Sequence, residues 1–240
     1  MRLRSVLALL LALGTGCGGA AGSGTASDTG VDAGVDAPVA VHAPPAAPPP
    51  PVETRPERRP PRAGDRVANE AGTYRVDTRP GQLGRVPRDE ADLVAIDVGD
   101  FEIDRLPYPN DPDLPPRTGV TQTEAQSACR ERSQRLCSEL EWELACTGGE
   151  TGRAFATGEA MDPNCEDDCP SPSGALRMGA PIGEWTSNRG NRGLPAAAAV
   201  FRGAPPGREL EKHRSGARRA AHPPTRRSTL GFLGGSSDVH

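Results

Sequence analysis

Apolar and polar residues alternate in two short stretches near the middle of the chain. Val94, Ile96 and Val98 fall on one side of an extended backbone, and Phe101 and Ile103 repeat the alternation after a glycine and an aspartate. A period of two is typical of half-buried β-strands. Similar short runs occur further along the chain, and the strands predicted in this way lie at 94–98, 101–103, 182–186 and 198–202.

Two helices are predicted from their capping residues. Thr121 is followed by Glu124, and Ser138 by Glu141, which is the capping-box spacing that satisfies free N–H groups at a helix start. Gly148 follows the second apolar run and can adopt the left-handed conformation that ends a helix. The predicted helices run from 121 to about 132 and over about 139–146.

The segment between the strands and the first helix is predicted to be irregular. Tyr108–Pro116 contains several prolines, each of which denies a β-ladder its donor. Trp142 and Trp185 are predicted to anchor the core, since a domain with few aromatic residues needs each of them to bury area. The fold class is therefore α+β, a loop-rich domain with two short helices and small antiparallel sheets.

The first residues predict export. Two arginines precede an apolar run at 6–13 that is too short to span a bilayer, and small residues lead to Cys17. This pattern indicates a bacterial lipoprotein signal at 1–16, with lipid attachment at Cys17 and no spanning helix. Gly14 stands where an aliphatic residue is usual, so an ordinary secretory peptide is the alternative. Either way we expect an exported chain, and the lipid would anchor it to a bacterial membrane facing the periplasm or the cell surface.

Composition divides the rest of the chain. Residues 17–64 are rich in Ala, Gly and Pro and include a proline tract at 43–52, which predicts a disordered, extended tether that cannot bury a core. We assign 65–92 to a poorly defined lead-in and 93–235 to one folded domain, a length usual for domains.

Charge argues against a nucleic-acid partner. The net charge is −4, and the positive charge is almost entirely arginine, concentrated at 189–227. A composition rich in Arg, Ala, Pro and Gly is what genome-wide codon bias produces, and aromatic residues do not alternate with the arginines as base stacking requires. We therefore expect no nucleic acid.

Cysteines are expected to form disulfides. Of the six cysteines, five lie beyond Cys17, and an exported domain with a thin core normally uses them as bridges. Two bridges and one leftover thiol is the simplest arrangement, with the connectivity open; a zinc site is the rival interpretation, disfavoured by the spacing. The candidates are Cys129, Cys137, Cys146, Cys165 and Cys169.

The order of several motifs resembles one family. Phe101-Glu-Ile-Asp104, the segment from Arg135 to Glu143, Gly183-Glu-Trp-Thr186, Val200-Phe-Arg-Gly203 and Gly231-Phe232 follow one another as in the formylglycine-generating enzyme and sulfatase-modifying factor family. The resemblance covers nearly all of 93–232. It implies a modified C-type-lectin-like fold, rich in irregular segments around small sheets and two helices.

The resemblance also implies chemistry that this chain lacks. Enzymes of the family bind copper with a cysteine pair late in the domain, because soft thiolates select Cu(I). No cysteine lies between Arg202 and Phe232, where His213 and His222 are the other candidate metal ligands; on an arginine-rich loop we expect both to be solvated. We therefore predict a degenerate, non-catalytic member of this family without copper.

Calcium remains an alternative at the run that ends in Glu184-Trp185. The family implies a calcium site here, but Pro181 replaces an asparagine and removes one oxygen ligand. A structural hydrogen bond from Glu184 is the competing interpretation, and no cofactor is predicted. The acids Glu139 and Glu143 share a helix face while Glu141 points elsewhere, so no converging acid–base site is expected.

The sequence thus favours a membrane-anchored binding domain for a protein or glycan at the bacterial envelope. The first alternative is an oxidoreductase of the same family with a rearranged site. The second is a structural envelope lipoprotein.

Overall fold

The structure is a computed structural model that describes residues 59–162, 169–205 and 207–236. These residues belong to one compact unit, which starts near Pro56. The predicted signal peptide, the lipid attachment residue Cys17 and almost all of the tether lie outside the described residues. Among the described residues, no helix combines the length and the apolar character that crossing a membrane requires.

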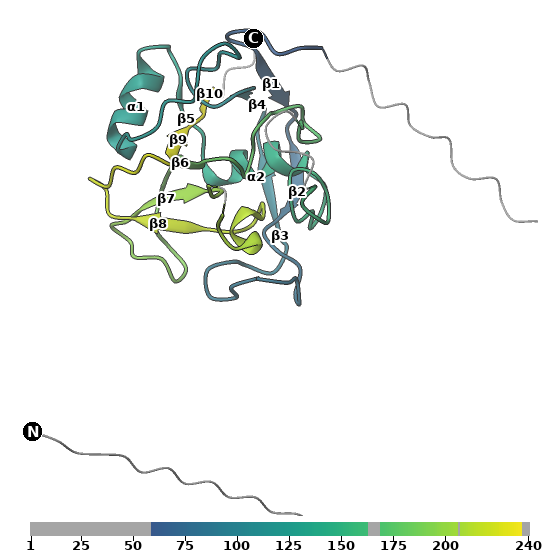
Figure 1. The fold of residues 1–240 in the computed structure, drawn as a ribbon. Helices are drawn as coiled ribbons and strands as arrows, with labels where there is room; N and C mark the ends of the chain where they lie inside the picture. The colour runs from purple at the N-terminus through teal and green to yellow at the C-terminus, as the bar shows by residue number, and fades with distance from the viewer. Residues whose placement is uncertain (1–58, 163–168, 206, 237–240) are drawn as a thin grey trace, which may run out of the picture. The chain divides into compact units, whose positions relative to one another are not determined.

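Three small sheets form the frame of the domain (Figure 1). The first has the order β1-β4-β10-β5 and is antiparallel, the second pairs β2 with β3, and the third has the order β8-β7-β6-β9. In the third sheet β6 and β9 run parallel, so the predicted small antiparallel sheets are confirmed except at this pair. The strands are β1 Arg66–Asn69, β2 Gly72–Val76, β3 Val94–Val98, β4 Phe101–Asp104, β5 Arg135–Leu136, β6 Gly183–Arg189, β7 Ala199–Arg202, β8 Arg219–Ala221, β9 Leu230–Phe232 and β10 Gly234–Ser236.

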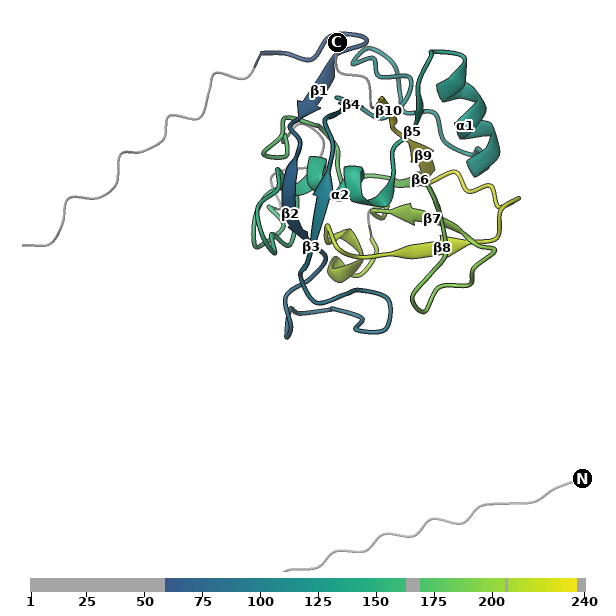
Figure 2. The ribbon, with the colours of Figure 1, turned by 180° about the vertical axis from the view of Figure 1, so that it is seen from behind.

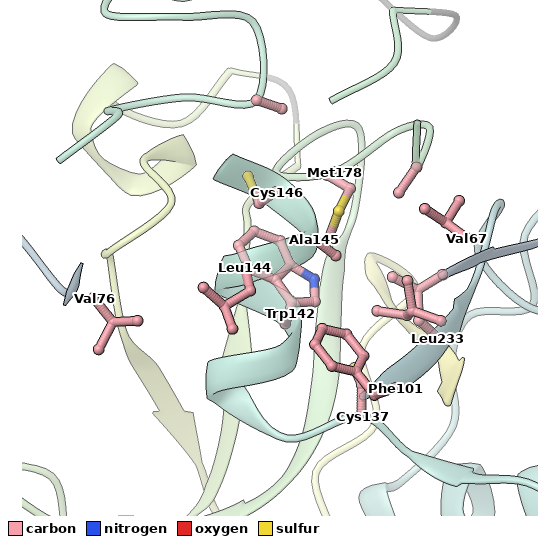
Figure 3. Packing of buried hydrophobic residues seen from close by; sticks show 13 residues of the cluster. Val67, Val76, Phe101, Cys137, Trp142, Leu144, Ala145, Cys146, Met178 and Leu233 are labelled. Atoms are coloured by element: carbon pink, nitrogen blue, oxygen red, sulfur yellow. The ribbon is translucent and has the colours of Figure 1, made fainter. Parts of the chain in front are cut away.

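Helix α2 (Glu139–Thr147) lies at the centre of the domain in both views (Figures 1 and 2). It contacts β1, β2 and β4 on one side and β6 and β7 on the other. Its Trp142 is fully buried within the cluster drawn in Figure 3, among side chains that include Phe101, Leu144 and Met178. Helix α2 therefore joins the sheets through a shared core.

Helix α1 (Gln122–Arg130) packs at the margin, against β5 and β6, and covers a second core cluster. Trp185 is fully buried there, donates to the Val120 carbonyl at 2.9 Å, and meets Phe201 edge-on. Both tryptophans thus anchor the core, as predicted.

Both capping boxes are present, with Thr121 paired to Glu124 and Ser138 to Glu141. Gly148 ends α2 in the left-handed conformation at φ 65°. Helix α1 stops at Arg130, short of the predicted end near 132, because the chain turns there and Ser133 takes a positive φ of 55°. The proline-rich segment after β4 is irregular, as predicted.

The folded unit begins earlier than the assigned boundary at 93. Strand β1 pairs antiparallel with β4, and β2 pairs with β3, so two parts of the stretch assigned to a lead-in at 65–92, namely 66–69 and 72–76, belong to the sheets. Their exposed faces and short length leave little apolar periodicity to detect. Between β2 and β3 the chain forms a long excursion, drawn in blue at the lower edge of Figures 1 and 2.

Candidate functional site

A buried ionic network connects α2 to the C-terminal third of the domain. The Arg202 guanidinium on β7 donates to Glu143 at 3.2 Å and to the Ser215 carbonyl at 2.7 Å, and lies 3.3 Å from Glu139. All three charged side chains are almost completely buried. The two glutamates share one helix face, as predicted, and that face meets an arginine. Arg202 therefore holds α2 onto the third sheet.

Glu139 has a second partner that the sequence did not reveal. Arg218 donates to both carboxylate oxygens, at 2.6 and 2.8 Å, and also to the Asp89 carbonyl at 2.9 Å. Burial by itself would raise the pKa of Glu139, but the Arg218 and Arg202 guanidinium groups lower it below its ordinary value. The main role of Glu139 is therefore this ion pair, which holds α2 to the C-terminal part of the domain.

A third buried pair holds the long β2–β3 excursion in place. Arg214 donates to the two oxygens of Glu90 at 2.9 and 2.8 Å and to the Gly84 carbonyl at 2.6 Å. Glu90 also accepts the Val86 N–H at 3.1 Å. A bidentate arginine–carboxylate pair fixes orientation as well as distance. The excursion is therefore tied to the segment that follows the short 3₁₀ helix η1 (Leu210–His213).

A cleft opens where this excursion meets η1. Its cavity volume is about 540 Å³, within the range of about 300–1,000 Å³ usual for ligand sites. Three segments distant in sequence form its walls. The lining residues are Arg79, Pro80, Gly81, Gln82, Leu83, Gly152, Ala154, Phe155, Glu159, Ala160, Leu210, Glu211 and Arg214.

Two glycines allow the walls to approach closely. A Cβ on Gly84 would stand 2.1 Å from the Glu211 Cβ, and a Cβ on Gly152 would stand 2.2 Å from the Arg79 Nε. Both glycines have positive φ, 72° and 69°, where side chains are disfavoured. The cleft is therefore shaped by backbone contacts as well as by the buried Arg214–Glu90 pair.

The rim of the cleft is apolar and exposed. Leu83 is 89% exposed and Leu210 is 52% exposed, while Arg79 and Glu159 form an ion pair at 2.7 Å beside them. Exposed apolar side chains grouped at a concave site indicate recognition of another molecule. This cleft could not be predicted from the sequence, because its walls meet only in the folded chain.

The prediction of two disulfide bridges and one leftover thiol was wrong, because three of the five candidate cysteines are free. Cys129, Cys137 and Cys146 are free, buried thiols. With these three cysteines free, only two of the five candidates remain, and two cysteines can form at most one bridge. Cys169 is disulfide-bonded, and Cys165 lies outside the described residues. The three thiols pack in the two apolar cores, where they behave as small hydrophobic side chains.

Burial makes these thiols unreactive in the folded protein. It raises the pKa of Cys129 to about 12, and it raises the pKa of Cys137 and Cys146 above their ordinary value as well. The thiolate is both the nucleophile and the metal ligand. These residues therefore do not fit a copper centre, and the segment from Arg202 to Phe232 contains no cysteine.

The two histidines are not brought together as a metal pair. His213 is buried, with its Nδ1 2.9 Å from the Gly179 carbonyl, so the prediction that it is solvated was wrong. It lies in η1, a packed element rather than an open loop. His222 is exposed, as predicted. Within the described ranges, no group of three or more His, Cys, Asp or Glu side chains is arranged to hold a metal ion.

Glu184 makes the structural hydrogen bond that competed with calcium binding. Its Oε2 accepts the Trp142 indole N–H at 2.8 Å, linking β6 to α2. The carboxyl is fully buried, and burial raises its pKa to about 8. A protonated carboxyl against an indole does not fit a calcium site, which needs six to eight oxygen ligands.

Comparisons with known proteins agree with this fold. Residues 101–171 match the model of the sulfatase-modifying factor enzyme 1-like domain. PvdO from Pseudomonas aeruginosa superposes with a TM-score of 0.60 at 18% identity, covering 71% of this chain and 93% of PvdO. No curated protein sequence matches the chain.

Two further solved structures show the same arrangement. Treponema denticola variable protein 1 gives a TM-score of 0.55 at 11% identity, covering 72% of this chain and 95% of its own. CarF gives 0.54 at 15% identity, with 71% and 97% covered. At these identities the likeness shows the fold alone. The chain therefore has a loop-rich α+β fold similar to that of these structures, which confirms the predicted fold class.

Proposed function

We propose that this domain is a non-catalytic binding module that recognises a protein partner through the cleft between the β2–β3 excursion and η1. The observation that carries the proposal is the cleft of about 540 Å³ with exposed Leu83 and Leu210 at its rim. Apolar anchors inserted in a concave site provide much of the energy of protein recognition. The buried Arg214–Glu90 pair holds the walls in position before a partner arrives.

A protein partner is favoured over a glycan by the lining of the cleft. Phe155 is the one aromatic residue among the lining side chains, and it is itself buried. Sugar rings commonly stack on exposed aromatic faces, which this cleft lacks. Leucine side chains at the rim instead suit an apolar side chain from another polypeptide.

Absence of catalysis is the second part of the proposal. The region where related enzymes are expected to carry two cysteines has none, and the free thiols described above are buried. The lipoprotein signal ending before Cys17 supports a membrane-anchored location at the bacterial envelope, with the Ala/Pro-rich segment as tether. Stoichiometric copper and oxidation of a peptide cysteine by the purified protein would instead favour the oxidoreductase alternative.

Photocrosslinking in the native cells tests the binding role. A photoreactive amino acid is placed at Leu83 or Leu210 of the full-length chain, and the matched control carries it at Leu114, which is 50% exposed and does not line the cleft. The proposal expects one shared protein adduct from both cleft positions and not from the control. Identical adduct patterns at all three positions, or none at the cleft, would refute it.

A loss-of-contact variant completes this experiment. Leu83→Asp places a charge on the rim without disturbing a buried residue, since the side chain is 89% exposed. The adduct formed at position 210 should then disappear while the folded protein remains. Persistence of the adduct would show that the partner does not use this rim.

A further inference from the structure

A second cavity, lined by other residues, carries an excess of positive charge. It has a volume of about 430 Å³ and includes three arginines, Arg59, Arg105 and Arg177. It shares no lining residue with the cleft described above. The remaining lining residues are apolar, namely Pro60, Pro61, Leu106, Pro112, Pro170 and Leu176.

One carboxylate offsets part of this charge. Asp65 lies 2.8 Å from Arg59 and 3.4 Å from Arg105. Burial works toward a higher pKa for Asp65, but the Arg62 backbone N–H and the two guanidinium groups lower it overall, so it is ionised at neutral pH. No other acidic side chain of the described residues forms an ion pair with these arginines. Three cations and one anion leave a net charge of two.

Arg177 is the unusual member of the group. Among the described residues its guanidinium has neither a hydrogen bond nor an ion pair, and its buried Nε has no partner. Its backbone takes a positive φ of 61°, a conformation that is uncommon for a residue with a long side chain. Strained backbone and an unsatisfied buried donor are features that concentrate at ligand sites.

From this geometry we propose that the pocket binds an organic anion, a carboxylate or phosphate group carried on an apolar body. Arg177 supplies the main donors. Arg59 can add to them because it engages Asp65 through Nη2 alone, at 2.8 Å, whereas Arg105 is held both by Asp65 and by the Arg59 carbonyl at 2.9 Å. A planar guanidinium can give two parallel hydrogen bonds to either oxyanion. The proline and leucine walls contact the apolar body of the ligand.

Titration calorimetry of the full-length chain in detergent tests this assignment. The probes are benzoate and phenyl phosphate, with benzamide as the neutral counterpart of benzoate and inorganic phosphate as an anion without an apolar body. The pocket should bind at least one of the aromatic anions more tightly than its control. Comparing the two anions distinguishes carboxylate from phosphate recognition.

Variants assign the binding to this pocket. Arg177→Gln should raise the Kd for the anion by roughly tenfold or more, as expected for loss of a charge-assisted contact. Arg208→Gln is the matched control, because Arg208 is exposed and lines none of these cavities. Arg59→Gln, near the start of the described chain, serves as a second test if Arg177→Gln does not fold.

Two results would overturn the assignment. One is that neither aromatic anion binds more tightly than its control, and the other is that both pocket variants leave the affinity for the anion unchanged. Neither result bears on the Leu83 and Leu210 cleft, so this inference and the proposed protein-binding role fail independently.

Discussion

The buried carboxyl of Glu184 makes the stability of this domain depend on pH in a defined direction. Its Oε2 accepts the Trp142 indole N–H, while its Oε1 is buried and has no partner among the described residues. Burial raises its pKa to about 8 from the ordinary value of 4.5. We predict that Glu184→Gln, which keeps a neutral polar group of the same shape, removes the part of this dependence that Glu184 contributes.

The magnitude follows from the two pKa values. Because the folded chain holds this proton more tightly than the unfolded chain, the stabilising effect is complete below about pH 4.5 and is lost as the pH rises through about 8. One pKa unit corresponds to about 1.4 kcal/mol, so the full difference is on the order of 5 kcal/mol. Between pH 5 and 8 the titration of Glu184 alone should lower the free energy of unfolding by up to about 1.4 kcal/mol per pH unit.

Urea unfolding followed by tryptophan fluorescence measures the effect, since Trp142 and Trp185 are both fully buried. Free energies of unfolding are compared at pH 5, 6, 7, 8 and 9 for the wild type and Glu184→Gln. Glu131→Gln is the matched control, because Glu131 is exposed at the end of α1. It should reproduce the wild-type slope.

The slope is the decisive quantity, rather than the stability at any one pH. A glutamine amide that lacks a partner would lower the free energy of unfolding by the same amount at every pH. The curve of the variant becomes flatter because the titrating carboxyl at position 184 is gone. Burial also raises the pKa of Glu143, to about 7, so part of the decline should remain in the variant. Parallel curves for Glu184→Gln and the wild type would refute the assignment of a buried, protonated Glu184.

Three further predictions concern the scaffold. Arg202→Met leaves two buried carboxylates without their shared partner and should lower the free energy of unfolding by about 3–5 kcal/mol, against little change for exposed Arg208→Met, in urea titrations. Gly84→Ala should lower the thermal midpoint more than Gly64→Ala, because both have positive φ but only the first would clash. The three buried free thiols should react with a disulfide reagent only after unfolding; reaction in the native state would contradict their burial.

Local signals predicted the helices and the central strands well. The capping boxes at Thr121 and Ser138 and the alternation of Val94, Ile96 and Val98 each depend on neighbours within a few residues. Such patterns can be read without knowing the rest of the fold. The same holds for the two tryptophans, whose size requires burial.

Long-range pairing explains what the sequence did not reveal. Arg218 meets Glu139 and Arg214 meets Glu90 across gaps of 79 and 124 residues, and nothing near either arginine indicates its partner. Within the arginine-rich segment 189–227, Arg202 and Arg214 are buried and the Arg218 side chain is only 5% exposed, which the composition of the segment did not indicate. Strands β1 and β2 were missed for the same reason, since their pairing with β4 and β3 is decided by the tertiary fold.

These buried pairs also bear on function. Arg202, Arg214 and Arg218 all belong to the segment from Arg202 to Phe232, which contains no cysteine, and each guanidinium is held by a carboxylate. A side chain engaged in this way fixes backbone geometry and is not available to a substrate without breaking a buried pair, which costs several kcal/mol. Under the proposed binding role, this segment supports the walls of the cleft, and the exposed Leu83 and Leu210 at its rim contact the partner.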